Sequence, residues 1–429
     1  NVIGNFKKMD SNIIGVKGEE FVNEIAYKSF FKYWCYPSPK HENGNKKEIC
    51  DLLIIFKDIC IIISVKNYEF KGNHLRYFNN TIEKAVKQIN GASKTLFKKD
   101  NIEIKHPDKN LEMFPKDKIS KTFKLIINLG ESLDFYEITR TTSKNDFISI
   151  FNKESFVTII SELDTIPDFI DYLEKRELLF KSKNVKVLNP IFKQDLNDKD
   201  KQFLTKDLQN SINIIGTEKD LLSYFFKNTR DFPKELYDNN GSMLLDICGA
   251  WEEFKISPKT IKKEYADKAS YFVDGFILNE VLKYDYSNKE DIAKELLSLN
   301  RLQRRTIGNN FFEFYGKVKG YKQGMLHRRF MEYDDLAVVL FNFHDNWNKE
   351  MIYKLFEIVF ETFAYHYKYK HRTFILIGIN KVPNFAFKIF KDYEKFSLED
   401  EKTIQENIKE LGWFTDYNLK NSTVNEFPK

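Results

Sequence analysis

Apolar residues near the start of the chain recur every three or four positions, and then give way to short continuous runs. Between residues 18 and 34 this spacing predicts an amphipathic helix. Two isoleucine-rich runs follow at 52–56 and 59–65, separated only by Lys57 and Asp58, which predicts a β-hairpin with a two-residue turn. Because both faces of these runs are apolar, we expect the sheet to be covered on both sides.

The pattern beyond the hairpin alternates between helical and strand signals. It predicts a helix over 81–96, strands over 122–129 and 155–160, and a helix that begins near Pro167 with Thr165 or Asp164 as its cap. After a polar stretch at 193–202 the chain is mainly helical, until a β-type run at 330–343, an aromatic helix near 348–369 and a strand at 374–380. We therefore expect an α/β (α+β) protein, with a mixed sheet flanked by helices in residues 1–190 and a second mixed α/β domain in 191–429.

Composition narrows the class of protein. The chain has 429 residues, of which 42% are hydrophobic, so it is globular rather than disordered. Its net charge of +5 is too small to indicate a nucleic-acid binder by itself. No uninterrupted apolar stretch is long enough for a membrane span, and four cysteines without zinc-type spacing fit a reducing compartment, so we expect a cytoplasmic protein with no membrane partner. The usual signatures of ATPases, zinc proteases and serine hydrolases are missing.

The hairpin brings together three polar side chains. A two-residue turn at Lys57 and Asp58 pairs Asp51 with Ser64, and Lys66 lies two residues further along the second strand. Because side chains alternate with a period of two, all three project from one face of the hairpin at its open end. A charge there is costly unless it is paired, so the carboxylate and ammonium either form an ion pair or hold a metal and a water.

These residues resemble the motif of the PD-(D/E)XK nuclease superfamily. The likeness covers about residues 15–165 and is sharpest in the strings KE-x-CDLL and FS-x-K of bacterial nuclease-like proteins; here the second reads IIISVK. It matches the superfamily aspartate to Asp51 in KEICD and its lysine to Lys66. The helix glutamate is matched to Glu20 in GEEFVNEI, with Glu19 as the adjacent choice, and the polar residue of the following helix to Gln88 in AVKQINGA.

The resemblance implies a restriction-endonuclease-like core with the order helix, strand, strand, strand, helix, strand. It also implies that Glu20 and Asp51 hold Mg²⁺ or Mn²⁺, that Lys66 orients or activates water, and that Gln88 supports the site while a phosphodiester of DNA is hydrolysed. The setting it implies is bacterial defence against foreign DNA. A separately encoded ATPase as partner and a homo-oligomer are further expectations.

One departure keeps two interpretations open. Where the superfamily usually has an acid two residues before the lysine, this chain has Ser64, a weak metal ligand. Glu83 on the following helix is one candidate for the missing carboxylate. Glu48 is another, although strand alternation would place it on the other face. A metal-dependent nuclease and a catalytically inactive module that binds DNA or a partner both fit this pattern.

A basic segment lies in the second half of the chain. Half of the ten arginines fall between residues 299 and 329, and Arg301, Arg304 and Arg305 are spaced as on one helix face. Such a face suits phosphate contact or an acidic protein partner. The alternative is a solvated helix face tied to nearby acids.

Overall fold

The computed structural model divides the chain into two units, Asn1–Ile256 and Ser257–Lys429, which are described separately. The structure describes residues 16–30, 32–68, 74–130, 138–142, 146–182, 185–188, 212–238, 243–284, 286–320, 326–382, 384–414 and 425–428. Both units combine helices with mixed sheets, as the sequence predicts.

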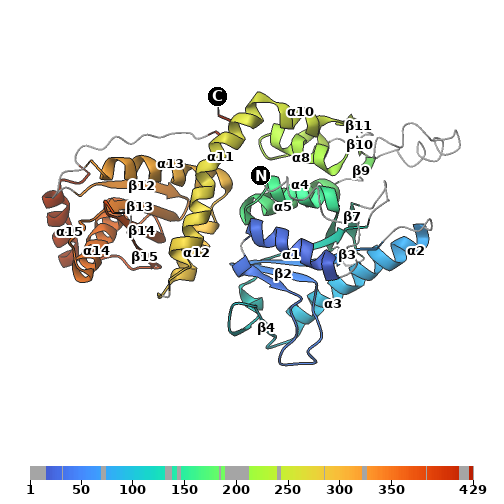
Figure 1. Ribbon diagram of the computed structural model, residues 1–429, viewed down its shortest axis with the longest axis horizontal. Coiled ribbons are helices and arrows are strands. Elements are labelled where there is room, and N and C mark those ends of the chain that lie inside the picture. Colours follow the sequence, from blue (N-terminus) through green and yellow to red (C-terminus); the bar gives the residue numbers. More distant parts are fainter. Residues whose placement is uncertain are drawn as a thin grey trace. The chain divides into compact units, whose positions relative to one another are not determined.

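The first unit is built on a six-stranded sheet with the order β1-β2-β3-β6-β8-β7 (Figure 1). Its strands are β1 (Cys35–Pro37), β2 (Leu52–Phe56), β3 (Ile59–Lys66), β6 (Lys121–Asn128), β7 (Thr139–Thr141) and β8 (Phe147–Asn152). Its longer helices are α1 (Val16–Phe30), α3 (Lys84–Lys98), α4 (Lys153–Glu162) and α5 (Ile166–Ser182). Shorter elements are η2 (Lys32–Trp34), α2 (His74–Phe78), η3 (Asn79–Glu83), β4 (Glu103–Lys105), β5 (Leu111–Met113) and η4 (Lys116–Lys118).

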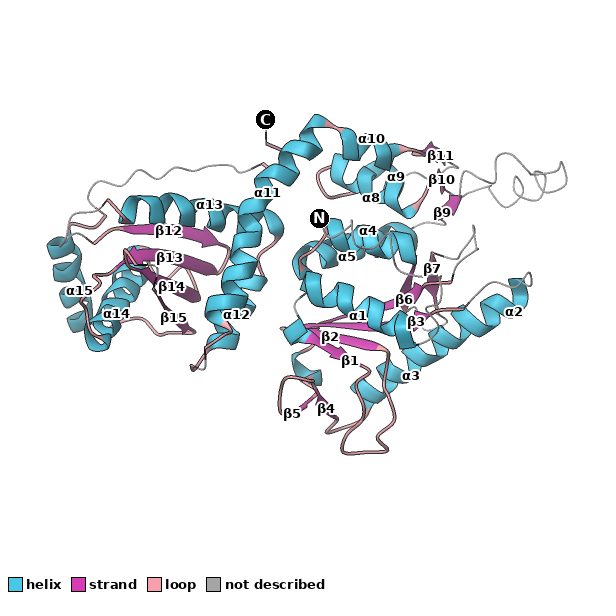
Figure 2. Ribbon diagram, in the orientation of Figure 1, coloured by secondary structure: helices cyan, strands magenta, loops and turns pink. Residues whose placement is uncertain are grey.

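The predicted hairpin is confirmed, including its register. Strand β2 pairs with β3 in antiparallel fashion, with Leu52 opposite Ile63 and Phe56 opposite Ile59. Strand β3 then pairs in parallel with β6, and α3 is the connection that crosses over between them. The apolar side of α3 packs on one face of the sheet, while α1 and α4 contact the other, so both faces are covered (Figure 2).

The strand expected over 155–160 is wrong, because these residues lie in helix α4. The Asn152 side chain accepts a hydrogen bond from the backbone N–H of Ser155 and so caps the helix. Phe156, Ile159 and Ile160 are then buried together, which is a helical spacing. The β-branched residues suggested a strand, but the cap and the helical spacing of the buried side chains outweigh that preference.

The boundary expected near residue 190 lies inside the first unit. Strand β9 (Val185–Leu188), just before that residue, pairs in parallel with β10 (Ile212–Ile215), which pairs with β11 (Met243–Asp246). The helices of this part are α8 (Glu218–Lys227), α9 (Lys234–Asp238) and α10 (Ala250–Ile256). The side chains of Arg176 on α5 and Glu218 on α8 form an ion pair of 2.7 Å with no exposure of either. This buried pair and the β9–β10 pairing join the two parts into one unit.

The second unit has a four-stranded sheet with the order β12-β13-β14-β15. Its strands are β12 (Arg328–Tyr333), β13 (Leu336–Asn342), β14 (Thr373–Ile379) and β15 (Phe385–Lys391). Its helical elements are α11 (Pro258–Phe276), η5 (Ile277–Val281), α12 (Lys289–Leu297), α13 (Arg301–Val318), α14 (Lys349–His366) and α15 (Leu398–Leu411). Helix α14 packs on one face through an aromatic core. The other face meets α11 and α13, for example where Phe276 and Phe311 contact Phe385.

The arginines of α13 do not form a cationic surface. Arg301, Arg304 and Arg305 are all at most 4% exposed. Arg301 and Arg304 share the carboxylate of Asp274, at 2.6 and 2.7 Å. The prediction of a phosphate-binding face is wrong. The alternative is correct in that nearby acids pair with the arginines, but wrong about solvation, because the packing of α11 on α13 buries the guanidinium groups with these acids.

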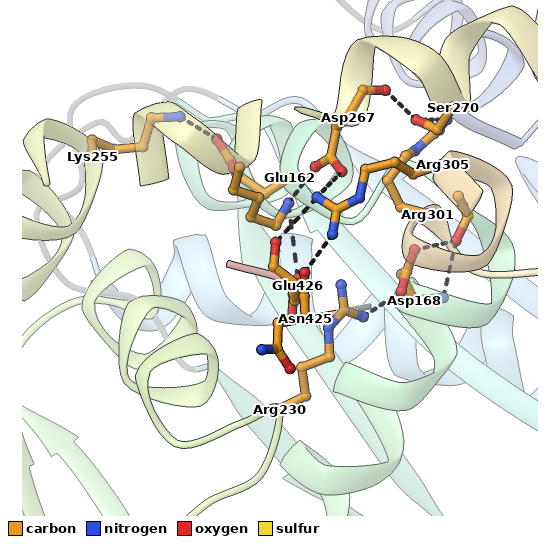
Figure 3. Close-up of polar contacts among 12 residues, drawn as sticks. Glu162, Asp168, Arg230, Lys255, Asp267, Ser270, Arg301, Arg305, Asn425 and Glu426 are labelled. Carbon is orange, nitrogen blue, oxygen red and sulfur yellow. Dashed lines mark hydrogen bonds and ion pairs between the residues drawn. The ribbon is translucent and has the colours of Figure 1, made fainter. Parts of the chain in front are cut away.

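Arg305 also holds the end of the described chain. Its guanidinium pairs with Asp267 at 3.1 Å and donates to the backbone carbonyls of Asn425 and Glu426, at 2.6 and 3.1 Å (Figure 3). Lys263 pairs with the same Asp267 carboxylate at 2.8 Å. Charge on this helix face therefore serves folding of the second unit.

Two further observations concern the class of protein. Cys35, Cys50 and Cys60 are buried thiols, Cys248 is exposed, and all four are free. Within the described residues, the structure contains no helix with the length and apolar character needed to span a membrane.

Candidate functional site

The candidate site lies at the open end of the β2–β3 hairpin. Asp51 immediately precedes β2, and Ser64 and Lys66 lie near the end of β3. Asp51 is 6% and Ser64 1% exposed, so polar groups here have been taken out of water. Because a buried polar group is costly without partners, each must be satisfied by its neighbours.

The Asp51 carboxylate is held by two donors from β3. Its Oδ2 atom lies 3.1 Å from the hydroxyl oxygen of Ser64, and it also accepts a hydrogen bond from the backbone N–H of Val65. The Ser64 hydroxyl lies 3.2 Å from the side-chain amide oxygen of Gln88 on α3. Since the hydroxyl has a single proton, it donates to one of these two oxygens at a time. The hairpin and the following helix thus meet at Asp51, Ser64 and Gln88, as the sequence predicts.

Lys66 completes the hairpin part of the site. Its ammonium nitrogen lies 3.7 Å from the Oδ2 atom of Asp51 and donates to the carbonyl of Val65 at 2.8 Å. Burial lowers the pKa of Lys66, and the negative charges of Asp51, Glu19 and Glu48 oppose this effect only in part. A lysine whose pKa is lowered gives up its proton more readily than one in water.

Helix α1 contributes Glu19 to the cluster. The pKa of Glu19 is raised first by burial and then by the charge of Asp51, while Lys66 and a hydrogen bond with Ser38 lower it. Glu20, the residue preferred from the sequence, is exposed. The assignment of the helix glutamate therefore moves to Glu19, because adjacent helical residues differ by about 100° around the axis and only one can face the hairpin.

Glu48 is the second acid beside Asp51, and although the residue as a whole is exposed, its carboxyl end lies against the site. Burial and the charge of Asp51 raise the pKa of Glu48 to about 6, and a hydrogen bond between the two carboxyl groups contributes. The expectation that Glu48 faces the other way is wrong. It assumed that the strand extends back to Glu48, whereas β2 begins at Leu52 and Glu48 forms only an isolated bridge with Lys40.

Glu83 takes no part in the cluster. Its carboxylate forms an ion pair of 2.6 Å with Arg140 on β7. It therefore does not supply the acid that Ser64 lacks.

Ser38 belongs to the site although nothing in the sequence singled it out. It lies in the left-handed region, with φ of 42°, and its backbone N–H donates to the carbonyl of Asp51 at 2.9 Å. Its side chain bonds Glu19. Its position between Pro37 and Pro39, in a bend after β1, is the one local signal that could have drawn attention to it.

The donor set suits a hard divalent cation in type. Carboxylate oxygens are the ligands that Mg²⁺ prefers, and Asp51, Glu48 and Glu19 concentrate negative charge beside one ammonium. In the described residues, however, no three His, Cys, Asp or Glu side chains lie close enough together to hold a metal ion already. The charge of Asp51 raises the pKa of both Glu19 and Glu48, so the three carboxyl groups are neighbours that a cation would have to draw closer together.

A row of lysines runs along α3 from the site. This helix of 15 residues contains no acid. Its exposed side carries Lys84, Lys87, Lys94 and Lys98, which we call the α3 lysine row. Within the described part of the chain none of the four forms an ion pair. The row spans roughly 21 Å, and Gln88 lies beside it on the same helix.

No protein-family model and no curated protein matches this chain.

Proposed function

We propose that the first unit is a metal-dependent nuclease that hydrolyses phosphodiester bonds of DNA. The observation that carries this proposal is the Asp51 carboxylate, buried at the end of a hairpin, with Lys66 at 3.7 Å and Glu19 and Glu48 as charged neighbours. The order α1, β1, β2, β3, α3, β6 agrees with the core that the motif implies. The α3 lysine row supports a polyanionic substrate, because phosphate contacts depend on unpaired lysines and arginines.

Each side chain has a role in this proposal. Asp51, Glu48 and Glu19 would hold Mg²⁺ or Mn²⁺, which supplies charge stabilisation and a more acidic bound water. Lys66 points at the same carboxylate, so its ammonium would orient the attacking water and contact the reacting phosphate. Ser64 and Gln88 position Asp51, and the Val65 N–H fixes its Oδ2 atom.

The experiment is cleavage of supercoiled plasmid with Mg²⁺ or Mn²⁺. Wild-type protein should nick the plasmid, and chelation of the metal should stop it. Asp51→Asn keeps the shape of the side chain and removes its charge, and Lys66→Met removes the ammonium; each should abolish nicking while the protein stays folded. The matched control is Lys121→Met, because Lys121 is paired with Glu174 at the other end of the parallel β3–β6 ladder from Lys66 and Asn128. Nicking retained in Asp51→Asn would refute the proposal.

Ser64 favours a second candidate, a nuclease-like module that binds DNA without cutting it. A hydroxyl at this position removes one of the usual metal-binding acids. In that case the wild-type protein would retard DNA in a gel but leave the plasmid intact with either metal. The nuclease proposal also includes a role in defence against foreign DNA and a separately encoded ATPase as partner. Co-purification tests for this partner.

A further inference from the structure

The two units share one arrangement of elements. In the first unit, helix α1 precedes the antiparallel β2–β3 hairpin, and α3 then leads to β6, which is parallel to β3. In the second unit, α13 precedes the antiparallel β12–β13 hairpin, and α14 leads to β14, which is parallel to β13. In both, the crossover helix packs on one face of the sheet and the preceding helix belongs to the other.

The turns of the two hairpins also agree. Each has two residues, Lys57 and Asp58 in the first unit and Asp334 and Asp335 in the second. The first residue of each turn is left-handed, with φ of 52° at Lys57 and 46° at Asp334. The parallel pairing then begins at the first residue of the strand after the turn in both units. The hairpins can therefore be compared residue by residue.

This comparison places Arg328 where the first unit has Asp51. Both lie six residues before their turn. Asp51 lies across from Ser64, and Arg328 is paired with Phe341. Asp51 faces α3, because the Ser64 hydroxyl beside it lies 3.2 Å from Gln88 on that helix. Arg328 faces the α14 side, because it lies over Trp413, which packs with α14, whereas the neighbouring Arg329 pairs with Glu313 on α13 at 2.7 Å. The second unit therefore repeats the core with a cation at the position of the metal-binding acid.

Aromatic rings, and no carboxylate of the described residues, contact the guanidinium of Arg328. Its guanidinium carbon lies 4.7 Å from the ring centre of Trp413 and 4.8 Å from that of Phe414. Among the described residues no acid pairs with it, and burial lowers its pKa to about 10. A guanidinium has five N–H donors, so a half-buried one without an acceptor is unfavourable until an anion binds.

Two imidazoles lie near the same guanidinium. His366 stacks on Phe414 with 3.9 Å between ring centres, and His327 precedes Arg328 in the chain. The pKa of each histidine is lowered by burial and then by the charge of Arg328. The side chains around Arg328 thus combine one cation, two imidazoles and aromatic faces. A cation can bind a phosphate, and aromatic faces can stack on a base of the same nucleic acid.

We propose that the second unit is a non-cleaving copy of the core whose Arg328 binds a phosphate of the nucleic-acid backbone. The inference depends on the proposed function in one respect: the proposed function identifies the phosphate as part of a nucleic acid. With Arg328, Phe341 and Phe343 at the positions of Asp51, Ser64 and Lys66, this unit holds and orients nucleic acid while the first unit cuts it.

The test is binding of a fluorescent 24-base-pair DNA to the full chain, followed by anisotropy at several salt concentrations. All proteins carry Asp51→Asn, so that no DNA is cut. Arg328→Gln should weaken binding and reduce the slope of log K against log salt by about 0.9, the value for one phosphate contact. The matched control is Arg329→Gln, which removes the same charge from the next residue and should leave the slope unchanged.

A second variant distinguishes the loss of the Arg328 charge from a loss of folding. Arg328→Lys keeps the charge, so it should retain the salt slope of the Asp51→Asn protein even where its stability differs. Equal slopes in the Arg328→Gln and Arg329→Gln proteins would overturn the inference. The proposed function fails separately, if plasmid is not nicked by wild-type protein while DNA binding still depends on Arg328.

Discussion

Ser64 lies directly across the β2–β3 hairpin from Asp51, and its hydroxyl oxygen is 3.1 Å from the Oδ2 atom of that carboxylate. Serine is a poor metal ligand, but here the Ser64 hydroxyl is a hydrogen-bond donor to the Asp51 carboxylate, on which the proposed site depends. Its contribution is to hold Asp51 in place.

Ser64→Ala should lower the free energy of unfolding by about 1–2 kcal/mol, because it removes a hydrogen bond to a buried charged group. Urea denaturation at neutral pH measures this, with the midpoint shifted and the m-value unchanged. Plasmid nicking should persist at a reduced rate. An unchanged midpoint would mean that the Ser64 hydroxyl does not support Asp51.

Glu19 and Glu20 give a matched pair on one helix. Glu19→Gln should reduce nicking at least about 100-fold, because it removes a charged oxygen from the proposed metal site. Glu20→Gln should leave the rate within twofold, since Asp51, Glu19 and Glu48, but not Glu20, are the acids whose charges act on Lys66. Initial rates at saturating Mg²⁺ decide between them, and the reverse ranking would restore the assignment based on sequence.

The raised pKa of Glu48 predicts how stability depends on pH. Its folded pKa of about 6 lies above the ordinary 4.5, so the folded state binds the proton more tightly. The stability that this proton confers is fully present below pH 4.5 and is lost as the pH rises to about 6 and beyond. Glu48→Gln should therefore stabilise the metal-free protein at pH 7.5, by about 1 kcal/mol after allowance for solvent screening, and have no such effect near pH 4.

The measurement for Glu48 is thermal unfolding across pH, with and without Mg²⁺. Wild-type protein should gain melting temperature when Mg²⁺ is added at pH 7.5, because the cation binds only the folded state. Glu48→Gln should gain less. An equal gain in both proteins would exclude Glu48 from the cation site.

The α3 lysine row should determine the salt dependence of DNA binding by the first unit. Replacing Lys87 and Lys94 together by Gln removes two phosphate contacts, and should reduce the salt slope by about 1.8. The control replaces Lys28 and Lys181, which are paired with Glu24 and Glu177. Fluorescence anisotropy in the Asp51→Asn background measures both, and equal slopes would show that the row is only a solvated surface.

The buried ion pair of Arg176 and Glu218 should be essential to the first unit. Arg176→Ala leaves a carboxylate with no exposure and no cation, and should cost about 3–5 kcal/mol. Lys175→Ala, which breaks a partly exposed pair with Asp231, should cost less than about 1 kcal/mol. Chemical denaturation compares the two, and similar costs would contradict the structural role of the buried pair.

The order of residues along the chain was sufficient to predict those features that depend on neighbouring residues alone. The turn of two residues and the strand period of two fix the register of the hairpin, so the sequence alone placed Asp51 opposite Ser64 and Lys66 on the same side. The resemblance also pointed to Gln88 on the next helix, whose side-chain amide oxygen lies 3.2 Å from the Ser64 hydroxyl. The strand expected at 155–160 failed because β-branched residues describe a preference, whereas the cap at Asn152 and the helical spacing of the buried side chains decide the outcome.

Tertiary packing determined which side chains are buried and which charges are paired, and residue spacing along the chain could not predict this. The rotation of α1 about its axis selects Glu19 over Glu20, and it depends on contacts with distant residues rather than on the two glutamates. Arg301 and its neighbours look like a basic surface until α11 covers them with carboxylates. The correspondence of Arg328 with Asp51 is likewise invisible in the sequence, because it rests on strand pairing that two unlike sequences share. Short-range sterics and the side-chain period depend on neighbouring residues, so the sequence reveals them. Burial and charge pairing depend on contacts between segments that are remote in the sequence, so only the tertiary structure reveals them.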